Sequence, residues 1–237
     1  MGENHSYGLD WIDEDALYEV TRLSFEKAFK KIESAKRGKT LPPDPFTLVA
    51  QAVLGGEGLP QAQIFEEQRS FNKTLSGNVG YWHQRVLGLA KNWTDTGASG
   101  GSIDLRTISD YRHPRYGKPL FAEVKNRFNT IKASDEKFTW DRLDSLARAN
   151  DAIAYLFQIV PATPEQYDRP WKVSGRSEKP IVRVCDGVTA YSLVFERPTA
   201  LHELYMALPR IFADFTGEGV KLDEAEMEKL FTTSLPA

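Results

Sequence analysis

Three observations predict an α/β (α+β) protein, in which helices flank a central mixed β-sheet and a helical N-terminal region precedes it. Apolar residues recur at helical spacing through most of the first 91 residues. The pattern changes to alternation over residues 102–127. A continuous apolar run follows at residues 152–160, as in a strand buried on both faces.

The N-terminal region should contain four helices. In the first, the apolar residues from Leu17 to Ile32 recur close to helical spacing, and a proline-rich break at residues 41–45 follows it. Ser76-Gly77-Asn78 offers a cap that should separate the third helix from the fourth. The predicted ranges are 13–36, 46–53, 60–72 and 79–91.

Strands and helices should alternate in the remainder. A Gly-rich link at residues 94–101 leads into two strands joined by a polar turn at residues 110–119. Ser134 should begin a helix, since Asp135 and Glu136 suit its first turn. Asp186-Gly187 is typical of a β-hairpin. The predicted strands are 102–109, 120–127, 152–160, 181–185 and 189–195, and the helices are 134–149 and 199–212.

The 237 residues are enough for one large domain or for one domain with an elaboration. We expect a helical elaboration over residues 1–75 and the core over residues 76–237. The elaboration is a candidate for dimerisation or DNA contact.

Composition excludes several classes of protein. One cysteine permits neither an intrachain disulfide framework nor a multi-cysteine metal cluster. The sequence contains no run of about 18 apolar residues, so we expect no membrane span. The acidic residues 1–15 lack the features of a signal peptide, so we expect a cytoplasmic protein.

Charge is distributed unevenly along the chain. The net charge of −3 argues against a non-specific nucleic-acid coat. Residues 106–137, however, hold eight Lys or Arg and four acids, a local charge of 8 − 4 = +4. This segment could hold a polyanion, or it could be a solvated hairpin surface.

Asp104, Glu123 and Lys125 are the candidate catalytic residues. Side chains two apart on one strand share a face, so Glu123 and Lys125 point the same way, and a hairpin would bring Asp104 beside them. Two neighbouring carboxylates repel each other and should recruit a divalent cation such as Mg²⁺. With a lysine to act on water or on the transition state, this set suits phosphodiester hydrolysis. The alternative is a surface ion pair between Glu123 and Lys125.

The surrounding sequence resembles the PD-(D/E)XK nuclease superfamily, and more closely the type II restriction endonucleases that cut GGNCC-like sites. The resemblance covers about residues 75–155 and departs at Ile103, where proline is expected. It is carried by Ser99-Gly100-Gly101-Ser102-Ile103-Asp104, Phe121-Ala122-Glu123-Val124-Lys125 and Tyr81-Trp82-His83-Gln84-Arg85-Val86-Leu87-Gly88.

The resemblance implies a restriction-endonuclease-like core. It implies that Asp104 and Glu123 bind magnesium, that Lys125 acts on the attacking water, and that Gln84 is an accessory near the metal. Asp110 is the fallback for Asp104. Cleavage should leave 5′-phosphate and 3′-hydroxyl ends.

Polar residues after the catalytic strand should contact DNA. Arg pairs bidentately with guanine and Asn with adenine, so Arg127 and Asn129 are the better candidates for reading bases. Lys132 and Ser134 could instead cap a helix or touch phosphate. The predicted contacts are Asn126, Arg127, Asn129, Thr130, Lys132 and Ser134, with Arg112, Arg115 and Lys118 on the backbone and further cations in residues 167–179.

Other conspicuous residues are expected to be structural. His83 should be packed or hydrogen-bonded, His113 exposed in a turn, and Cys185 a small buried hydrophobe. Trp140, Leu143 and Ala147 should form the core side of their helix.

We therefore expect a magnesium-dependent, site-specific double-stranded DNA endonuclease of the type II restriction class. A homodimer would match the symmetry of a palindromic site. Two alternatives stay open: a structure-specific repair or recombination nuclease of the same fold, and a DNA-binding protein without catalytic activity.

Overall fold

The computed structural model describes residues 5–36, 44–97, 103–217, 219 and 221–236. The Gly-rich residues 98–101, the first residue of the predicted strand 102–109 and most of the proline-rich break lie outside these ranges. The elements within them are α1 (Glu14–Lys36), α2 (Pro45–Gly55), α3 (Leu59–Leu87), β1 (Trp93–Asp95), β2 (Leu105–Thr107), β3 (Leu120–Arg127), α4 (Ala133–Ala149), β4 (Ile153–Val160), β5 (Asp168–Pro170), β6 (Val182–Asp186), α5 (Gly187–Phe195), α6 (Ala200–Thr216) and α7 (Glu224–Ser234).

The strands form one mixed sheet in the order β1-β2-β3-β4-β6-β5. Its centre is parallel, because β4 pairs in parallel with both β3 and β6. The outer pairs β1–β2, β2–β3 and β5–β6 are antiparallel. This arrangement confirms the predicted fold class. The connection from β3 to β4 runs through α4, as a parallel crossover requires.

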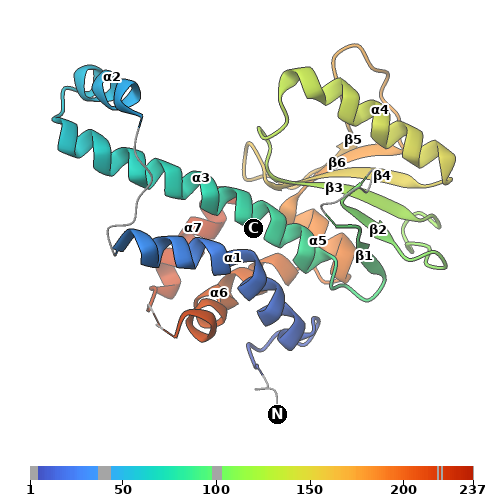
Figure 1. The fold of residues 1–237 in the computed structure, drawn as a ribbon. Coiled ribbons are helices and arrows are strands. Elements are labelled where there is room, and N and C mark those ends of the chain that lie inside the picture. The colour runs from blue at the N-terminus through green and yellow to red at the C-terminus, as the bar shows by residue number, and fades with distance from the viewer. Residues whose placement is uncertain (1–4, 37–43, 98–102, 218, 220, 237) are drawn as a thin grey trace.

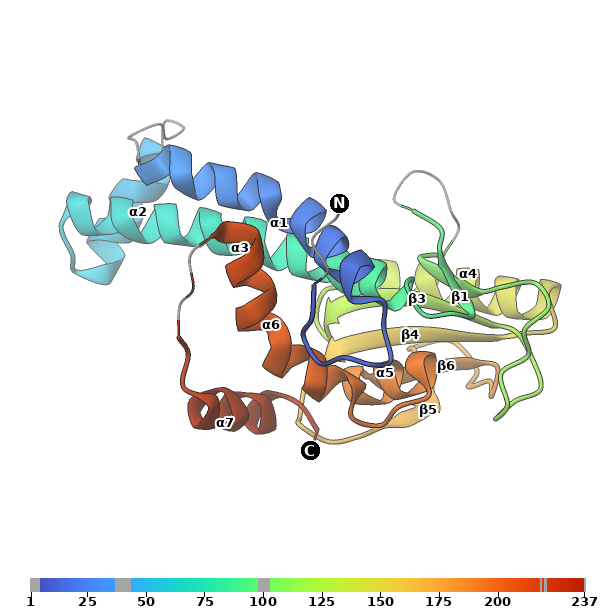
Figure 2. The same ribbon diagram turned by 90° about the horizontal axis from the view of Figure 1, so that it is seen from below.

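Helices cover both faces of the sheet (Figures 1 and 2). α4 lies alone on one face, where Trp140, Leu143 and Ala147 are buried against Leu156, as predicted for that helix. α3, α5 and α6 cover the other face through a larger core, which α1 joins through residues such as Leu17. Alternation along β3 therefore divides its side chains between the two cores.

α2 and the first turns of α3 extend away from the sheet (Figure 1). They pack on each other through a small separate cluster of Leu48, Ala52 and Ala62. No helix in the part of the chain that the structure describes is long and apolar enough to cross a lipid bilayer.

The predicted break at Ser76-Gly77-Asn78 is wrong, because α3 continues through it. Leu75 and Val79 both pack against the larger core, and one unbroken helix keeps them on the same side. A glycine inside a helix costs only about 1 kcal/mol relative to alanine, which this packing offsets. Ser76-Gly77-Asn78 therefore lowers helix stability locally without ending the helix.

The predicted strand 189–195 is also wrong, because these residues form most of α5. The Asp186 carboxylate accepts hydrogen bonds from the backbone N–H and the hydroxyl of Thr189, and so caps a helix where the sequence suggested a hairpin. The short strands β1 and β5 and the helix α7 were not predicted.

Two glycine-to-alanine substitutions should have opposite effects on stability. At Gly187 a Cβ would lie 2.3 Å from the carbonyl oxygen of Ile159, so Gly187→Ala should lower the free energy of unfolding by about 3 kcal/mol. At Gly77 nothing lies within 4 Å, so Gly77→Ala should raise it by about 1 kcal/mol. Denaturant unfolding measures both. Equal effects would contradict the close packing of α5 on β4.

Candidate active site

The pairing of β2 with β3 brings Asp104 to Glu123. Leu105 pairs with Ala122, and this antiparallel register, continued by one residue, places Asp104 opposite Glu123. Asp104 Oδ2 accepts a hydrogen bond of 2.8 Å from the backbone N–H of Val124. Asp104 therefore stands beside the predicted catalytic strand, as the sequence led us to expect.

Two cations hold the Glu123 carboxylate, which is only 6% exposed. Lys125 Nζ lies 2.7 Å from Oε1, and Arg142 Nη2 lies 2.7 Å from Oε2. Glu123 and Lys125 thus share a face, as their spacing predicted. Arg142 comes from α4, which covers this face of the sheet, and sequence reasoning missed it.

The charge on Asp104 is destabilised by its surroundings. Burial, and then the neighbouring Glu123 carboxylate, raise the pKa of Asp104 to about 6. The Val124 N–H, Lys125 and Arg142 act in the opposite direction without cancelling these effects. A carboxylate kept close to a second one despite this cost is typical of a functional site.

The donor set fits a hard divalent cation. Among the described residues no group of three or more His, Cys, Asp or Glu could hold a metal ion. A cation here would have two carboxylate ligands, Asp104 and Glu123, and would fill its shell with water and substrate oxygens. Mg²⁺ is bound in this way in many sites, and its charge would relieve the repulsion between the two acids.

Gln84 does not lie with these residues. Its amide donates a 2.7 Å hydrogen bond to Asp95 Oδ1. Asp95 pairs with Leu105, so its side chain points towards α3, whereas Asp104 and Glu123 face α4. The structure therefore brings together three of the four predicted residues, with Gln84 on the other face of the sheet.

The segment after Lys125 is largely exposed at the end of β3 near the start of α4. Arg127, Asn129, Lys132 and Ser134 are exposed, and within the part of the chain that the structure describes the side chains of the first three form no hydrogen bond or ion pair. Thr130 donates to the carbonyl of Arg127. Ser134 lies in the first turn of α4, where its hydroxyl donates to the Asp135 carboxylate. Asn126 instead faces α3, where it donates to the carbonyl of Ser76.

The other predicted DNA contacts lie at the opposite end of β3. About nine residues of extended chain separate Lys118 from Arg127, which corresponds to roughly 30 Å. There Arg115 pairs with Asp168 at 2.6 Å, and Lys118 pairs with Asp151 at 2.6 Å. Arg112 is exposed and donates to nearby carbonyls. These cations form a group separate from residues 127–134.

Most cations of the loop 167–179 are also engaged. Arg176 makes two hydrogen bonds of 2.6 Å to Asp141, and Lys179 binds Asp144 at 2.8 Å. These ion pairs fasten the loop to α4. They leave fewer free charges for DNA than the sequence suggested.

His83 and Cys185 are buried, as predicted. His83 Nδ1 lies 2.7 Å from the Tyr191 hydroxyl, and burial lowers its pKa to about 3, so the ring is neutral near pH 7. The expectation that His113 is exposed is wrong. It is buried beneath the turn, with Nε2 3.3 Å from the carbonyl of Leu193.

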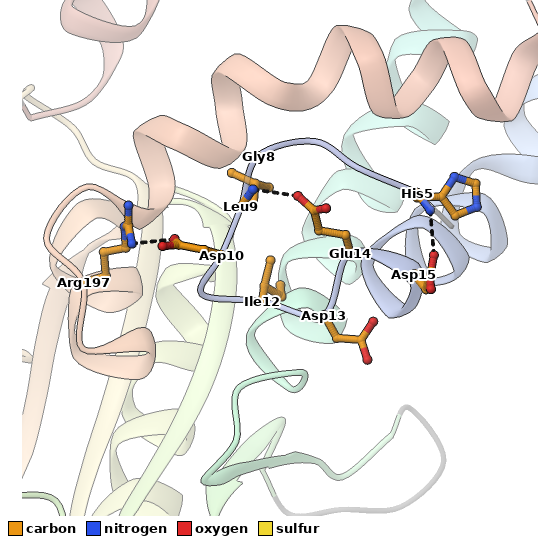
Figure 3. Close-up of a pocket in the computed structure, with 9 residues that line it drawn as sticks. All are labelled: His5, Gly8, Leu9, Asp10, Ile12, Asp13, Glu14, Asp15 and Arg197. Carbon is orange, nitrogen blue, oxygen red and sulfur yellow. Dashed lines mark hydrogen bonds and ion pairs between the residues drawn. The ribbon is translucent and has the colours of Figure 1, made fainter. Parts of the chain in front are cut away.

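A cavity of about 660 Å³ lies elsewhere, between the N-terminal segment and Arg197 in the loop before α6 (Figure 3). Four acidic side chains line it against one arginine, a charge balance that does not suit a phosphate. Glu14 accepts hydrogen bonds from the backbone of Tyr7 and Leu9, and Asp10 pairs with Arg197 at 2.8 Å. These acids order the N-terminal segment, and none belongs to the predicted site.

Comparison with known proteins places the chain among nucleases. The family model described as Eco47II restriction endonuclease matches residues 9–216. The type II restriction enzyme Eco47II of Escherichia coli is 32% identical over 213 residues, covering 85% of each chain. The type II restriction enzyme Sau96I of Staphylococcus aureus is 23% identical over 220 residues, covering 87% of this chain and 80% of its own.

Removing the charge of Asp104 should stabilise the metal-free protein. The folded-state pKa of about 6 exceeds the usual 3.8, so ionisation costs stability as the pH rises, most at pH 8 and least below pH 4. Asp104→Asn should raise the free energy of unfolding at pH 8 by about 2 kcal/mol, after allowance for partial exposure, and by little near pH 4.

Unfolding in EDTA at several pH values measures this gain. Asp110→Asn, in the exposed turn, is the matched control and should change stability by less than about 0.5 kcal/mol. A destabilised Asp104→Asn at pH 8 would contradict the assigned repulsion.

Proposed function

Because the chain belongs to the Eco47II restriction endonuclease family, we propose that it uses Mg²⁺ to cut both DNA strands at a short palindrome. Family membership makes it a site-specific endonuclease acting on double-stranded DNA. The proposed site is GC-rich and of the GGNCC kind, as the sequence resemblance implies. The observation that carries the proposal is the placement of Asp104, Glu123 and Lys125 on one face of β2 and β3.

Asp104 and Glu123 would hold the metal in a PD-(D/E)XK arrangement. A bound Mg²⁺ neutralises charge on the phosphate and lowers the pKa of a coordinated water. Glu123 keeps the Lys125 ammonium beside the site, where it can orient the attacking water or stabilise negative charge at phosphorus. Attack breaks the bond from phosphorus to the 3′ oxygen, which takes a proton, and leaves a 5′-phosphate and a 3′-hydroxyl.

Residues 127–134 would carry specificity. They leave the catalytic strand directly, so a base contact by Arg127 or Asn129 would lie close to the bond that is cut. Lys132 would touch phosphate. We propose residues 76–237 as the catalytic core and the cytoplasm as the place where the enzyme meets DNA.

We also propose that the enzyme is a homodimer, which joins through the projecting tip formed by α2 and the start of α3. α2 contains no charged residue. Its Phe46 and Leu54 are 84% and 88% exposed. Large apolar side chains exposed together mark an interaction surface. The exposed apolar residues of the tip are Phe46, Val49, Val53, Leu54, Leu59, Ile64 and Phe65.

A second copy suits this surface better than DNA does. A polyanion needs cations, and α2 offers none. The apolar face of α2, which carries no charged residue, can meet its own copy across a twofold axis without repulsion between like charges. A stable interface buries roughly 800 Å² per partner, and seven large side chains, each about half exposed or more, supply an area of that order.

Loss of either proposed catalytic group should abolish cleavage. Asp104→Ala removes a metal ligand and Lys125→Ala removes the ammonium, so each should slow cutting of a sequenced plasmid in Mg²⁺ by about 10³-fold or more. Asp110→Ala and Lys91→Ala, at exposed positions, are the matched controls and should cut normally. End mapping of the wild-type digest gives the site.

Three results would contradict this assignment. Normal cutting by Asp104→Ala or Lys125→Ala would remove these residues from the chemistry. Preferential cutting of flaps or junctions would favour a structure-specific nuclease. Tight site-specific binding with no cleavage in any divalent metal would leave a binding protein only.

Charging the tip should separate the dimer. Phe46→Glu with Leu54→Glu should convert a particle of two chains to one of a single chain in sedimentation equilibrium, because isologous pairing would bury four carboxylates. Leu222→Glu with Leu230→Glu changes two leucines elsewhere, 55% and 60% exposed, and should leave the dimer intact. A monomeric wild type, or a dimeric tip variant, would contradict this interface.

A further inference from the structure

We propose that Arg142 binds the phosphate to be cut and leaves Glu123 as it does so, so that DNA binding opens the metal site. This inference rests on the proposed function and adds a residue to it. Arg142 Nη2 lies 2.7 Å from Glu123 Oε2.

Both oxygens of the Glu123 carboxylate are engaged by protein cations. Lys125 holds Oε1 and Arg142 holds Oε2, each at 2.7 Å. Together with Asp104, the four groups carry two negative and two positive charges, a formal sum of zero. A cation that enters this neutral site must compete with a guanidinium for Glu123 and is repelled by it.

Arg142 has no other carboxylate partner among the described residues. The nearby acids of α4 are engaged elsewhere, Asp141 by Arg176 at 2.6 Å and Asp144 by Lys179 at 2.8 Å. If Arg142 leaves Glu123, it therefore needs a new anion. The DNA phosphate is the anion that the proposed reaction brings to this place.

The chemistry of the side chain suits that exchange. A guanidinium carries five N–H donors in a planar fork that matches a phosphate. Arg142 is ion-paired with Glu123 through Nη2, while its buried Nε lacks a partner in the described structure. Its side chain is 28% exposed, so a phosphate at the surface of the site can reach it.

The exchange couples two binding events. With DNA absent, Arg142 occupies Glu123 Oε2 and weakens metal binding. With the phosphate present, Arg142 moves to it and frees the oxygen for the cation. Because linkage is reciprocal, Mg²⁺ must then strengthen DNA binding by the factor by which DNA strengthens Mg²⁺ binding.

The first experiment measures Mg²⁺ affinity of the DNA-free protein by isothermal titration calorimetry. Arg142→Gln removes the competing charge and should bind Mg²⁺ about tenfold more tightly than wild type. Arg142→Lys keeps the charge and should bind it as weakly as wild type. Arg148 pairs with Asp144 on the same helix, so Arg148→Gln is the matched control and should leave the Mg²⁺ affinity unchanged.

The second experiment measures binding of a duplex that carries the mapped site, in Ca²⁺, by fluorescence anisotropy. A neutral methylphosphonate at the scissile position should weaken wild-type binding about tenfold more than it weakens binding by Arg142→Gln, because both proteins lose the contact with the cation but only the wild type also loses the contact with Arg142.

The proposal requires both results, and the absence of either would overturn it. Its failure can be told from failure of the proposed function. A protein that cuts at a defined site yet shows neither effect refutes the role of Arg142 alone. A protein that cuts no DNA refutes the proposed function, while the Mg²⁺ titration still tests competition for Glu123.

Discussion

Repulsion between the carboxylates of Asp104 and Glu123 is the constraint around which this site is built. The antiparallel register of β2 and β3 places the two acids opposite each other, and the Val124 N–H fixes Asp104 there. Lys125 and Arg142 neutralise Glu123, while Asp104 retains a raised pKa. Such a cost in stability is common where function needs groups that folding alone would not bring together.

The elements that the sequence predicted well are those with a strong local pattern. The strand 120–127 has the predicted bounds, since Leu120, Ala122 and Val124 alternate with Phe121, Glu123 and Lys125 along it. The amphipathic pattern of α4 and the apolar run of β4 gave bounds within two residues. Strand spacing was also sufficient to place Glu123 with Lys125, and a hairpin sufficed to bring Asp104 near them.

Tertiary packing decided what the sequence alone did not predict. Asp186-Gly187 suits a hairpin locally, but Gly187 lies against Ile159 and Asp186 caps α5. Arg142 lies seventeen residues after Lys125, and its contact with Glu123 depends on how α4 docks on the sheet. Gln84 was expected near the metal, yet its helix covers the opposite face. Spacing along the chain gave no information on either docking angle.

The most direct test of this account is a crystal structure of the protein with its DNA site and Mn²⁺, whose anomalous scattering locates the ion without ambiguity. The account predicts a peak between the carboxylates of Asp104 and Glu123, about 2.1 Å from an oxygen of each, with a DNA phosphate in the same coordination shell. A peak elsewhere, or Glu123 still held by both cations with no ion beside it, would contradict the account.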